Sequence, residues 1–236
     1  MQSLQKAPNF PWGKIFAKRS RYANMHELKI DFHTHPLGHL YYPEVVTTTQ
    51  MDAYEKSLIQ QMIRIGIKRD LDAIALTDHN DFRGGFYGSR WAQQQGLPIK
   101  VIPGAELSVI IEGEEIHILA LGANEAINFN PYDDFDLIIQ AIQDAEGIAI
   151  LAHPHYYPEI FPKLKDYIDG VEYYNGANAS LNPQNQFFEE LVDVEYEGLK
   201  TFGSDHHLPY KLRPEQLAGF TIVTEEMAQT IKHILK

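Results

Sequence analysis

From residue 28 onward, short apolar runs rich in β-branched residues alternate with segments whose apolar residues recur at three- and four-residue spacing. The first pattern predicts buried strands and the second predicts amphipathic helices. The predicted strands are Leu28–Phe32, Ala73–Thr77, Lys100–Ala105, Ile148–Ala152, Val171–Tyr174, Lys200–Gly203 and Gly219–Val223. The predicted helices are Met51–Ile67, Phe135–Ala145, Gln184–Glu197 and Glu225–Leu235. Repeated strand and helix units favour a parallel α/β sheet, which is either a barrel or open.

One segment departs from this alternation. Leu107–Ile111 and Glu115–Leu121 are two apolar runs separated by Glu112-Gly113-Glu114. A short polar linker with a central glycine is typical of a β-hairpin. The sequence therefore predicts a hairpin that turns at Gly113.

The chain has 236 residues, of which 44% are hydrophobic, and this is enough for one large core. We expect a single domain over residues 28–236, preceded by a basic arm at residues 1–27. The first 26 residues contain five basic residues and no acidic one. We expect the arm to pack on the domain through Trp12 and Phe16, with an arm for a polyanion as the alternative.

Net charge and cysteine content exclude several classes of protein. The formal net charge of −12 argues against binding duplex nucleic acid through many phosphate contacts. The sequence has no cysteine, so any metal is held by nitrogen and oxygen ligands. Neither a secretory signal nor a membrane span is readable, and the expected location is cytoplasmic.

Histidines and carboxylates gather where predicted strands end. Side chains alternate along a strand, so His33 and His35 point in the same direction and their imidazoles converge. Five further segments contribute His79 with Asp78, Glu106, His117, His153 with His155, and His206 and His207 with Asp205. In a parallel α/β sheet the strand ends face one side of the molecule. This many imidazole and carboxylate groups predict a cluster of two or three divalent ions of zinc, manganese or iron.

These segments, in this order, resemble the PHP (polymerase and histidinol phosphatase) superfamily. The resemblance covers Asp31 to about His207 and implies a distorted (β/α)7 barrel with the metal site at the C-terminal ends of its strands. It also implies the ligand groups. One ion has His33, His35, Glu106 and Asp205 as ligands, a second shares Glu106 and adds His117 and His153, and a third has His79 and His207. The family usually supplies a further ligand shortly after the first two histidines, and His39 is the candidate for it here.

Further residues are assigned supporting roles. His155 or His206 is a candidate general acid, with a hydrogen-bonded rim residue as the alternative. Arg83 is the candidate phosphate contact, unless it is a solvated loop charge. Carboxylates or amides beside ligating imidazoles fix their orientation, and the candidates are Asp31, Asp78, Glu172 and Asn175. For Glu172, a purely structural buried carboxylate is an equal alternative.

The resemblance implies a metal-dependent phosphoesterase, in which a metal-activated hydroxide hydrolyses a phosphomonoester or phosphodiester. The expected substrate is small and phosphorylated, such as a nucleotide or an oligonucleotide end. Two alternatives stay open. One is an amidohydrolase-like enzyme acting on a C–N or C–O bond, and the other is a non-catalytic metal-stabilised binding module.

Overall fold

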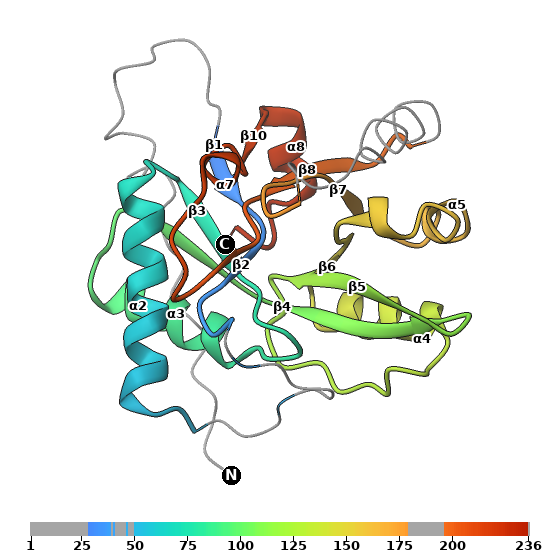
Figure 1. Ribbon diagram of the computed structural model, residues 1–236, viewed down its shortest axis with the longest axis horizontal. Helices are drawn as coiled ribbons and strands as arrows, with labels where there is room; N and C mark the ends of the chain where they lie inside the picture. The colour runs from blue at the N-terminus through green and yellow to red at the C-terminus, as the bar shows by residue number, and fades with distance from the viewer. Residues whose placement is uncertain (1–27, 39, 41–45, 47–49, 179–195, 236) are drawn as a thin grey trace.

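The computed structural model describes residues 28–38, 40, 46, 50–178 and 196–235 (Figure 1). The predicted arm at residues 1–27 lies outside these residues. Most of the predicted helix Gln184–Glu197 lies outside them as well.

Eight strands form one sheet that curves almost into a closed barrel (Figure 1). In chain order they are β1 (Leu28–Asp31), β3 (Ala73–Leu76), β4 (Lys100–Ile111), β5 (Glu114–Leu121), β6 (Ile148–Leu151), β7 (Gly170–Asn175), β8 (Leu199–Gly203) and β10 (Thr221–Val223). Their order in the sheet is β10-β1-β3-β4-β5-β6-β7-β8. A bridge between Gly203 and Phe220 brings the two edges together. The prediction of a distorted α/β barrel is confirmed.

Antiparallel pairs interrupt the parallel barrel at two places. The strand β10 runs antiparallel to β1, and β5 runs antiparallel to both β4 and β6. The predicted hairpin is present, but its first strand is not separate from the predicted strand Lys100–Ala105. The two are one continuous strand, β4, so Glu106 lies within a strand and not after its end. Uninterrupted pairing with β5 from Gly104 to Ile111 explains this continuity.

Helices cover the outside of the barrel. They are α2 (Ala53–Lys68), α3 (Arg83–Gln94), α4 (Phe135–Asp144), α5 (Phe161–Leu164), α7 (Pro214–Leu217) and α8 (Glu225–Thr230), with a 3-10 helix η1 at Pro154–Tyr156. The start of α2 is fixed by a capping box, in which Glu55 N donates to Asp52 and Asp52 N donates to Glu55. The last predicted helix, Glu225–Leu235, is shorter than expected and ends at Thr230.

The helix α3 was not predicted, because its glycines have low helix propensity. Packing supplies the reason for them. A Cβ at Gly85 would lie 2.8 Å from backbone atoms of Pro103 and Gly104, and one at Gly88 would lie 2.6 Å from Leu76. The helix therefore approaches β3 and β4 more closely than a larger residue would allow, which places the segment from Asp78 to Phe82 over the end of the barrel.

The interior of the barrel is apolar and is closed by the C-terminal segment. Ile231, Ile234 and Leu235 belong to the same buried cluster as Ile30 of β1 and Ile150 of β6. With this filling, the polar strand ends are left for a site at the opposite end.

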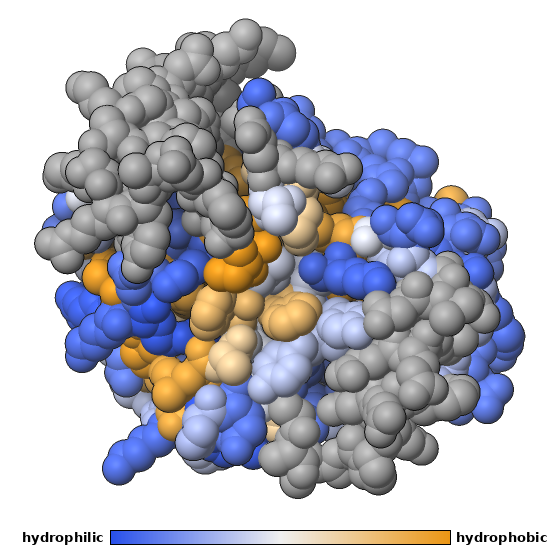
Figure 2. All heavy atoms as spheres, turned by 90° about the horizontal axis from the view of Figure 1, so that it is seen from above, coloured by the Kyte–Doolittle hydropathy of each residue, from blue (hydrophilic) through white to orange (hydrophobic). Residues whose placement is uncertain are grey.

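One face of the molecule, seen in Figure 2, carries apolar side chains in its centre and hydrophilic ones around them. The exposed large apolar residues include Leu217 of α7 and Ile222 of β10, at 50% and 38% exposure.

Among the described residues, no helix is both long and apolar enough to cross a membrane.

Candidate metal centre

A short parallel pair of strands brings two of the predicted segments together. The strand β2 (Thr34–His35) pairs with β9 (His206–His207), with His35 opposite His207. The ring centroids of these two histidines lie 4.0 Å apart. The backbone N–H of Asp205 donates to His33 O at 2.8 Å, which fixes the carboxylate segment beside the first histidines.

Glu106 lies at the centre of the site and is 1% exposed. It enters from β4, and a parallel bridge places it next to His79. In the hairpin, Glu106 pairs with Leu119, so His117, two residues from Leu119, lies on the same face of the sheet. Three segments thus direct their side chains to one point.

The two carboxylate oxygens of Glu106 face different groups of imidazoles. Its Oε1 lies 2.9 Å from His117 Nδ1 and 2.8 Å from His153 Nε2. Its Oε2 lies 3.4 Å from His33 Nε2, 3.2 Å from His35 Nε2 and 3.1 Å from His79 Nδ1. A carboxylate arranged in this way can contribute one oxygen to each of two neighbouring ions.

Asp205 completes the group on the Oε2 side. Its Oδ1 lies 3.3 Å from His35 Nε2 and 3.7 Å from His33 Nε2. Both Asp205 and His153 have left-handed backbone conformations, with φ of 49° and 29°. Such conformations are costly for residues other than glycine and cluster at functional sites, where the surroundings hold them.

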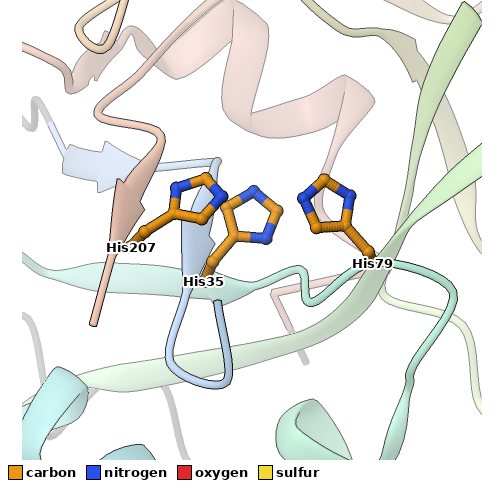
Figure 3. A group of neighbouring side chains, drawn as sticks. All are labelled: His35, His79 and His207. Atoms are coloured by element: carbon orange, nitrogen blue, oxygen red, sulfur yellow. The ribbon is translucent and has the colours of Figure 1, made fainter. Parts of the chain in front are cut away.

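A third group consists of His35, His79 and His207, which come from three different segments and lie side by side in Figure 3. The rings of His35 and His79 are stacked with centroids 4.5 Å apart, and those of His79 and His207 are 5.7 Å apart. His79 also approaches Glu106, so it lies between the predicted third ion and the predicted pair. The remaining candidate, His39, lies outside the described residues.

The donors fit divalent metal ions. His33 Nε2 and His35 Nε2 face each other at 2.9 Å, and both face carboxylate oxygens. Two imidazole nitrogens at this distance need a proton or a cation between them. All the donors are imidazole or carboxylate, the set that suits zinc, manganese or iron. These groups therefore have the composition and spacing of a metal-binding cluster, while the ligand role of each residue stays a prediction.

The charges of the cluster are strongly coupled. Burial opposes ionisation of Glu106, but the nearby imidazoles of His117 and His33 hold its pKa well below its usual range. Burial likewise opposes protonation of His33, and the carboxylates of Glu172, Glu106 and Asp205 raise its pKa well above the usual value. Because a ligating imidazole must be unprotonated, loading the site with metal displaces protons from it.

Glu172, on β7, contacts a predicted metal ligand, and its supporting role stays a prediction. Its Oε1 accepts from His33 Nδ1 at 2.9 Å, which leaves His33 Nε2 facing the cluster. Its Oε2 accepts from His153 N at 2.9 Å and from Asn175 Nδ2 at 3.0 Å. The same Asn175 amide donates to Asp205 Oδ2 at 3.1 Å. These two residues therefore connect both sides of the cluster.

Replacing Glu172 by glutamine is expected to lower metal affinity by about 10- to 100-fold. The amide nitrogen would meet the N–H of His33, so the imidazole would lose its fixed orientation. Competition with a chromophoric chelator measures the change, and the exposed Glu159→Gln is the control. An unchanged affinity in Glu172→Gln would show that this hydrogen bond does not orient the ligand.

Asp31 and Asp78 differ from the prediction, because within the described part of the chain no imidazole donates a hydrogen bond to either carboxylate. Asp31 accepts from the backbone N–H groups of His33 and Ser204 and forms an ion pair with Arg69. Asp78 accepts from Leu37 N at 2.6 Å, and burial raises its pKa to about 8. Both carboxylates hold the backbone of the ligand segments and not the ligands themselves.

Arg69 and Gln216 were missed by the sequence analysis. Besides Asp31, the Arg69 guanidinium donates to Gln216 O at 3.2 Å and to Gly219 O at 3.1 Å. Gln216 in turn donates from Nε2 to Asp205 O at 3.2 Å. A single arginine after a helix gives no sequence signal for this role, which depends on contacts between residues more than a hundred positions apart.

The predicted general acids His155 and His206 are both buried next to the cluster. Burial is the main cause that lowers the pKa of each to about 4. Both imidazoles are then uncharged near neutral pH, with one N–H each. The general-acid role of either histidine stays a prediction.

The predicted phosphate contact Arg83 begins α3 and is not in a loop. Its guanidinium contacts Asp81 at 2.8 Å and Glu55 at 3.2 Å and donates to Gln50 O. It does not belong to the residues that line the cleft described next. The structure therefore gives Arg83 a role in fixing the start of α3.

A cleft of about 590 Å³ opens onto the cluster. Its floor is made by cluster residues, including Glu106 and His153, and its walls include Glu115, Tyr156 and Asn178. Tyr156 donates to Asn178 Oδ1 at 2.6 Å at the mouth. None of the described residues that line this cleft is a lysine or an arginine.

Three comparisons with solved structures show the fold. A candidate metal-dependent phosphoesterase from Bifidobacterium adolescentis matches with a TM-score of 0.55 and 14% identity, covering 86% of this chain and 96% of the other. An amidohydrolase from Chromobacterium violaceum, solved with sulfate and no metal, matches with a TM-score of 0.53 and 17% identity, covering 84% and 99%. A two-domain protein from Bacteroides vulgatus that contains a predicted PHP-like metal-dependent phosphoesterase matches with a TM-score of 0.55 and 17% identity, covering 89% and 63%.

The sequence comparison covers a smaller part of the chain than the structural comparisons do. An uncharacterised protein of Methanocaldococcus jannaschii is 32% identical over 123 residues, which are 49% of this chain and 65% of that protein. No family model matches the sequence. The chain thus has the fold shared by PHP-like proteins, and the expected resemblance is confirmed at the level of the fold.

Proposed function

We propose that this chain, with its PHP-like fold, is a metallohydrolase that cleaves phosphate esters. The observation that carries the proposal is the position of Glu106, whose two oxygens face two separate groups of imidazoles at the floor of an open cleft. A binding module that used metal only for stability would have no need of a cleft over the ions.

The residues that would hold the ions fall into the groups described above. His33, His35, Asp205 and Glu106 form one, Glu106, His117 and His153 form the second, and His79 with His207 is the candidate for the third. Two or three divalent ions bound there would supply a hydroxide nucleophile near neutral pH and neutralise charge on phosphoryl oxygens.

The protein's own residues position and shield this chemistry. Glu172 keeps Nε2 of His33 facing the cluster, and Asn175 holds Asp205 in place. The cleft lining that the structure describes has carboxylates but no lysine or arginine. The negative charge of a phosphate would therefore have to be compensated by the metal ions, which makes hydrolysis dependent on their presence.

The amidohydrolase alternative has less support. Enzymes of that kind with paired metals often use a carbamylated lysine as a bridging ligand. No lysine lies among the described residues that line the cleft, and Lys100 and Lys200 are at the starts of their strands. In the proposed site the bridging ligand is Glu106 instead.

The proposal is tested by assaying metal-loaded protein against phosphomonoesters, phosphodiesters, carboxylic esters and amides. We expect turnover of at least one class of phosphate ester, its loss on removal of metal by a chelator, and its return when metal is added back. Turnover of esters or amides alone would support the amidohydrolase alternative. Absence of turnover with every class would support a binding module.

A further inference from the structure

A second pocket, of about 490 Å³, lies directly beside the metal centre. Asp205 and His207 line both this pocket and the cleft, so the two spaces share a wall. Most of the rest of its lining comes from the segment after β9, including Tyr210, Lys211 and Arg213, and Ala177 and His206 complete it. None of the contacts described above for the metal centre uses these three residues.

The charge of this pocket is opposite to that of the cleft. Lys211 and Arg213 are exposed and line the pocket, whereas the described lining of the cleft has neither lysine nor arginine. Apart from Asp205, which faces the cluster, no carboxylate is found in the described lining of the second pocket. An anion bound at the metal centre would therefore find exposed positive side chains in the adjoining pocket.

Hydrogen bonds that involve the backbone fix the position of Arg213 relative to the metal centre. The guanidinium of Arg213 donates from Nη2 to Ala177 O at 2.6 Å, and Arg213 N donates to Gln216 Oε1 at 3.0 Å. The amide of the same Gln216 donates to Asp205 O at 3.2 Å. Because one side chain connects both, the position of Arg213 is coupled to that of Asp205.

The buried side of the pocket carries an unused polar group. His206 lines the pocket and is 1% exposed, and neither of its ring nitrogens has a hydrogen-bond partner among the described residues. Buried polar atoms normally have hydrogen-bond partners. The ring nitrogens of His206 therefore indicate that a hydrogen-bonding group is missing beside them. A small movement of the ring would let it donate to an anion in the pocket.

From these observations we infer that the second pocket binds an anionic group of the substrate other than the phosphate that reacts. The inference rests on the proposed phosphoesterase function. The preferred substrate is then a phosphate ester whose alcohol part carries a carboxylate or a second phosphate. Lys211 supplies a point charge, and Arg213 offers the planar donors that suit either anion.

Three matched probes test this inference: para-tolyl phosphate, para-carboxymethylphenyl phosphate and para-phosphonomethylphenyl phosphate. Their leaving groups are alike in reactivity and differ in charge. We expect the native protein to prefer at least one anionic probe in kcat/KM by about tenfold, the worth of one charge-assisted contact. The double variant Lys211→Gln, Arg213→Gln should lose that preference.

The control is Lys163→Gln, because Lys163 is an exposed lysine that is paired with Glu112 on the hairpin and does not line the second pocket. It should keep the preference. The thermal midpoint of each variant shows that it is folded. The two anionic probes distinguish a carboxylate from a phosphate as the favoured group.

Hydrolysis of all three probes at equal kcat/KM, or a preference that survives in the double variant, would overturn the inference and leave the proposed function standing. Failure to hydrolyse any of the probes or any other phosphate ester would overturn the proposed function, and the inference with it.

Discussion

Replacing Glu106 by alanine is expected to remove more than one metal equivalent from the protein. Phosphate ester hydrolysis should fall by more than about a hundredfold, because loss of a hydrogen-bond partner of a ligand alone has an effect of up to about that size. The reason is geometric. Its Oε1 faces His117 and His153, and its Oε2 faces His33, His35 and His79. Among the described residues, no other carboxylate faces imidazole nitrogens of both groups.

Metal content of the purified variant and its turnover are measured together. Glu106→Gln keeps the shape of the side chain and one oxygen, so it should retain more metal than the alanine variant. Glu114→Gln is the control, because Glu114 lines the same cleft but is exposed on the hairpin. Loss of a single ion in Glu106→Ala would contradict the bridging role.

Replacing Arg69 by methionine is expected to destabilise the fold by about 3–5 kcal/mol, the usual effect of removing one partner from a buried ion pair. The side chain of Arg69 is 7% exposed and that of Asp31 is 0% exposed. Asp31 accepts from the backbone of His33 and Ser204, so the loss would also loosen the segments that carry metal ligands. Thermal or denaturant unfolding measures the change.

The loss of stability in Arg69→Met should also depend on pH. Burial raises the pKa of Asp31 above its usual value, and the charge of Arg69 opposes this increase. Without Arg69 the folded state binds a proton at Asp31 more tightly than the unfolded state does. Stability therefore falls as pH rises from the ordinary pKa of an aspartate to the raised pKa of Asp31 in the folded state. The destabilisation is therefore expected to be larger at about pH 8 than at about pH 5.

Two further variants make this expectation specific. In a protein that already carries Asp31→Asn, the Arg69→Met change should have a smaller effect, by roughly 1–3 kcal/mol, because no buried charge is left unpaired. Arg64→Met on the same helix removes an exposed arginine that lies over Trp91, and it should change stability little. Equal effects of Arg69→Met in both backgrounds would show that the ion pair is not the cause.

The part of the site that could be predicted depended on the alternation of side chains and on the convergence of strand ends. His33, His35, His153 and Asp205 follow apolar runs that could hardly be anything but strands, and a barrel brings the ends of such strands together. The structure places these residues around Glu106. The histidine at position 117 could be placed there only because the hairpin was recognised.

Other parts could not be predicted, for physical reasons. The helix α3 contains glycines that favour a loop by propensity and are needed for close packing on β4. Asp31, Asp78 and Glu172 are alike in sequence, since each is a carboxylate at or near a strand end. Which of them contacts an imidazole and which contacts backbone or Arg69 is decided by distances of a few ångströms between distant segments.

The central claim is that this cleft holds a metal cluster bridged by Glu106, and metal analysis of the native protein purified without chelator tests it most directly. The account predicts two or three equivalents of zinc, manganese or iron per chain, together with hydrolysis of a phosphate ester. Fewer than two equivalents after incubation with these metals would contradict it.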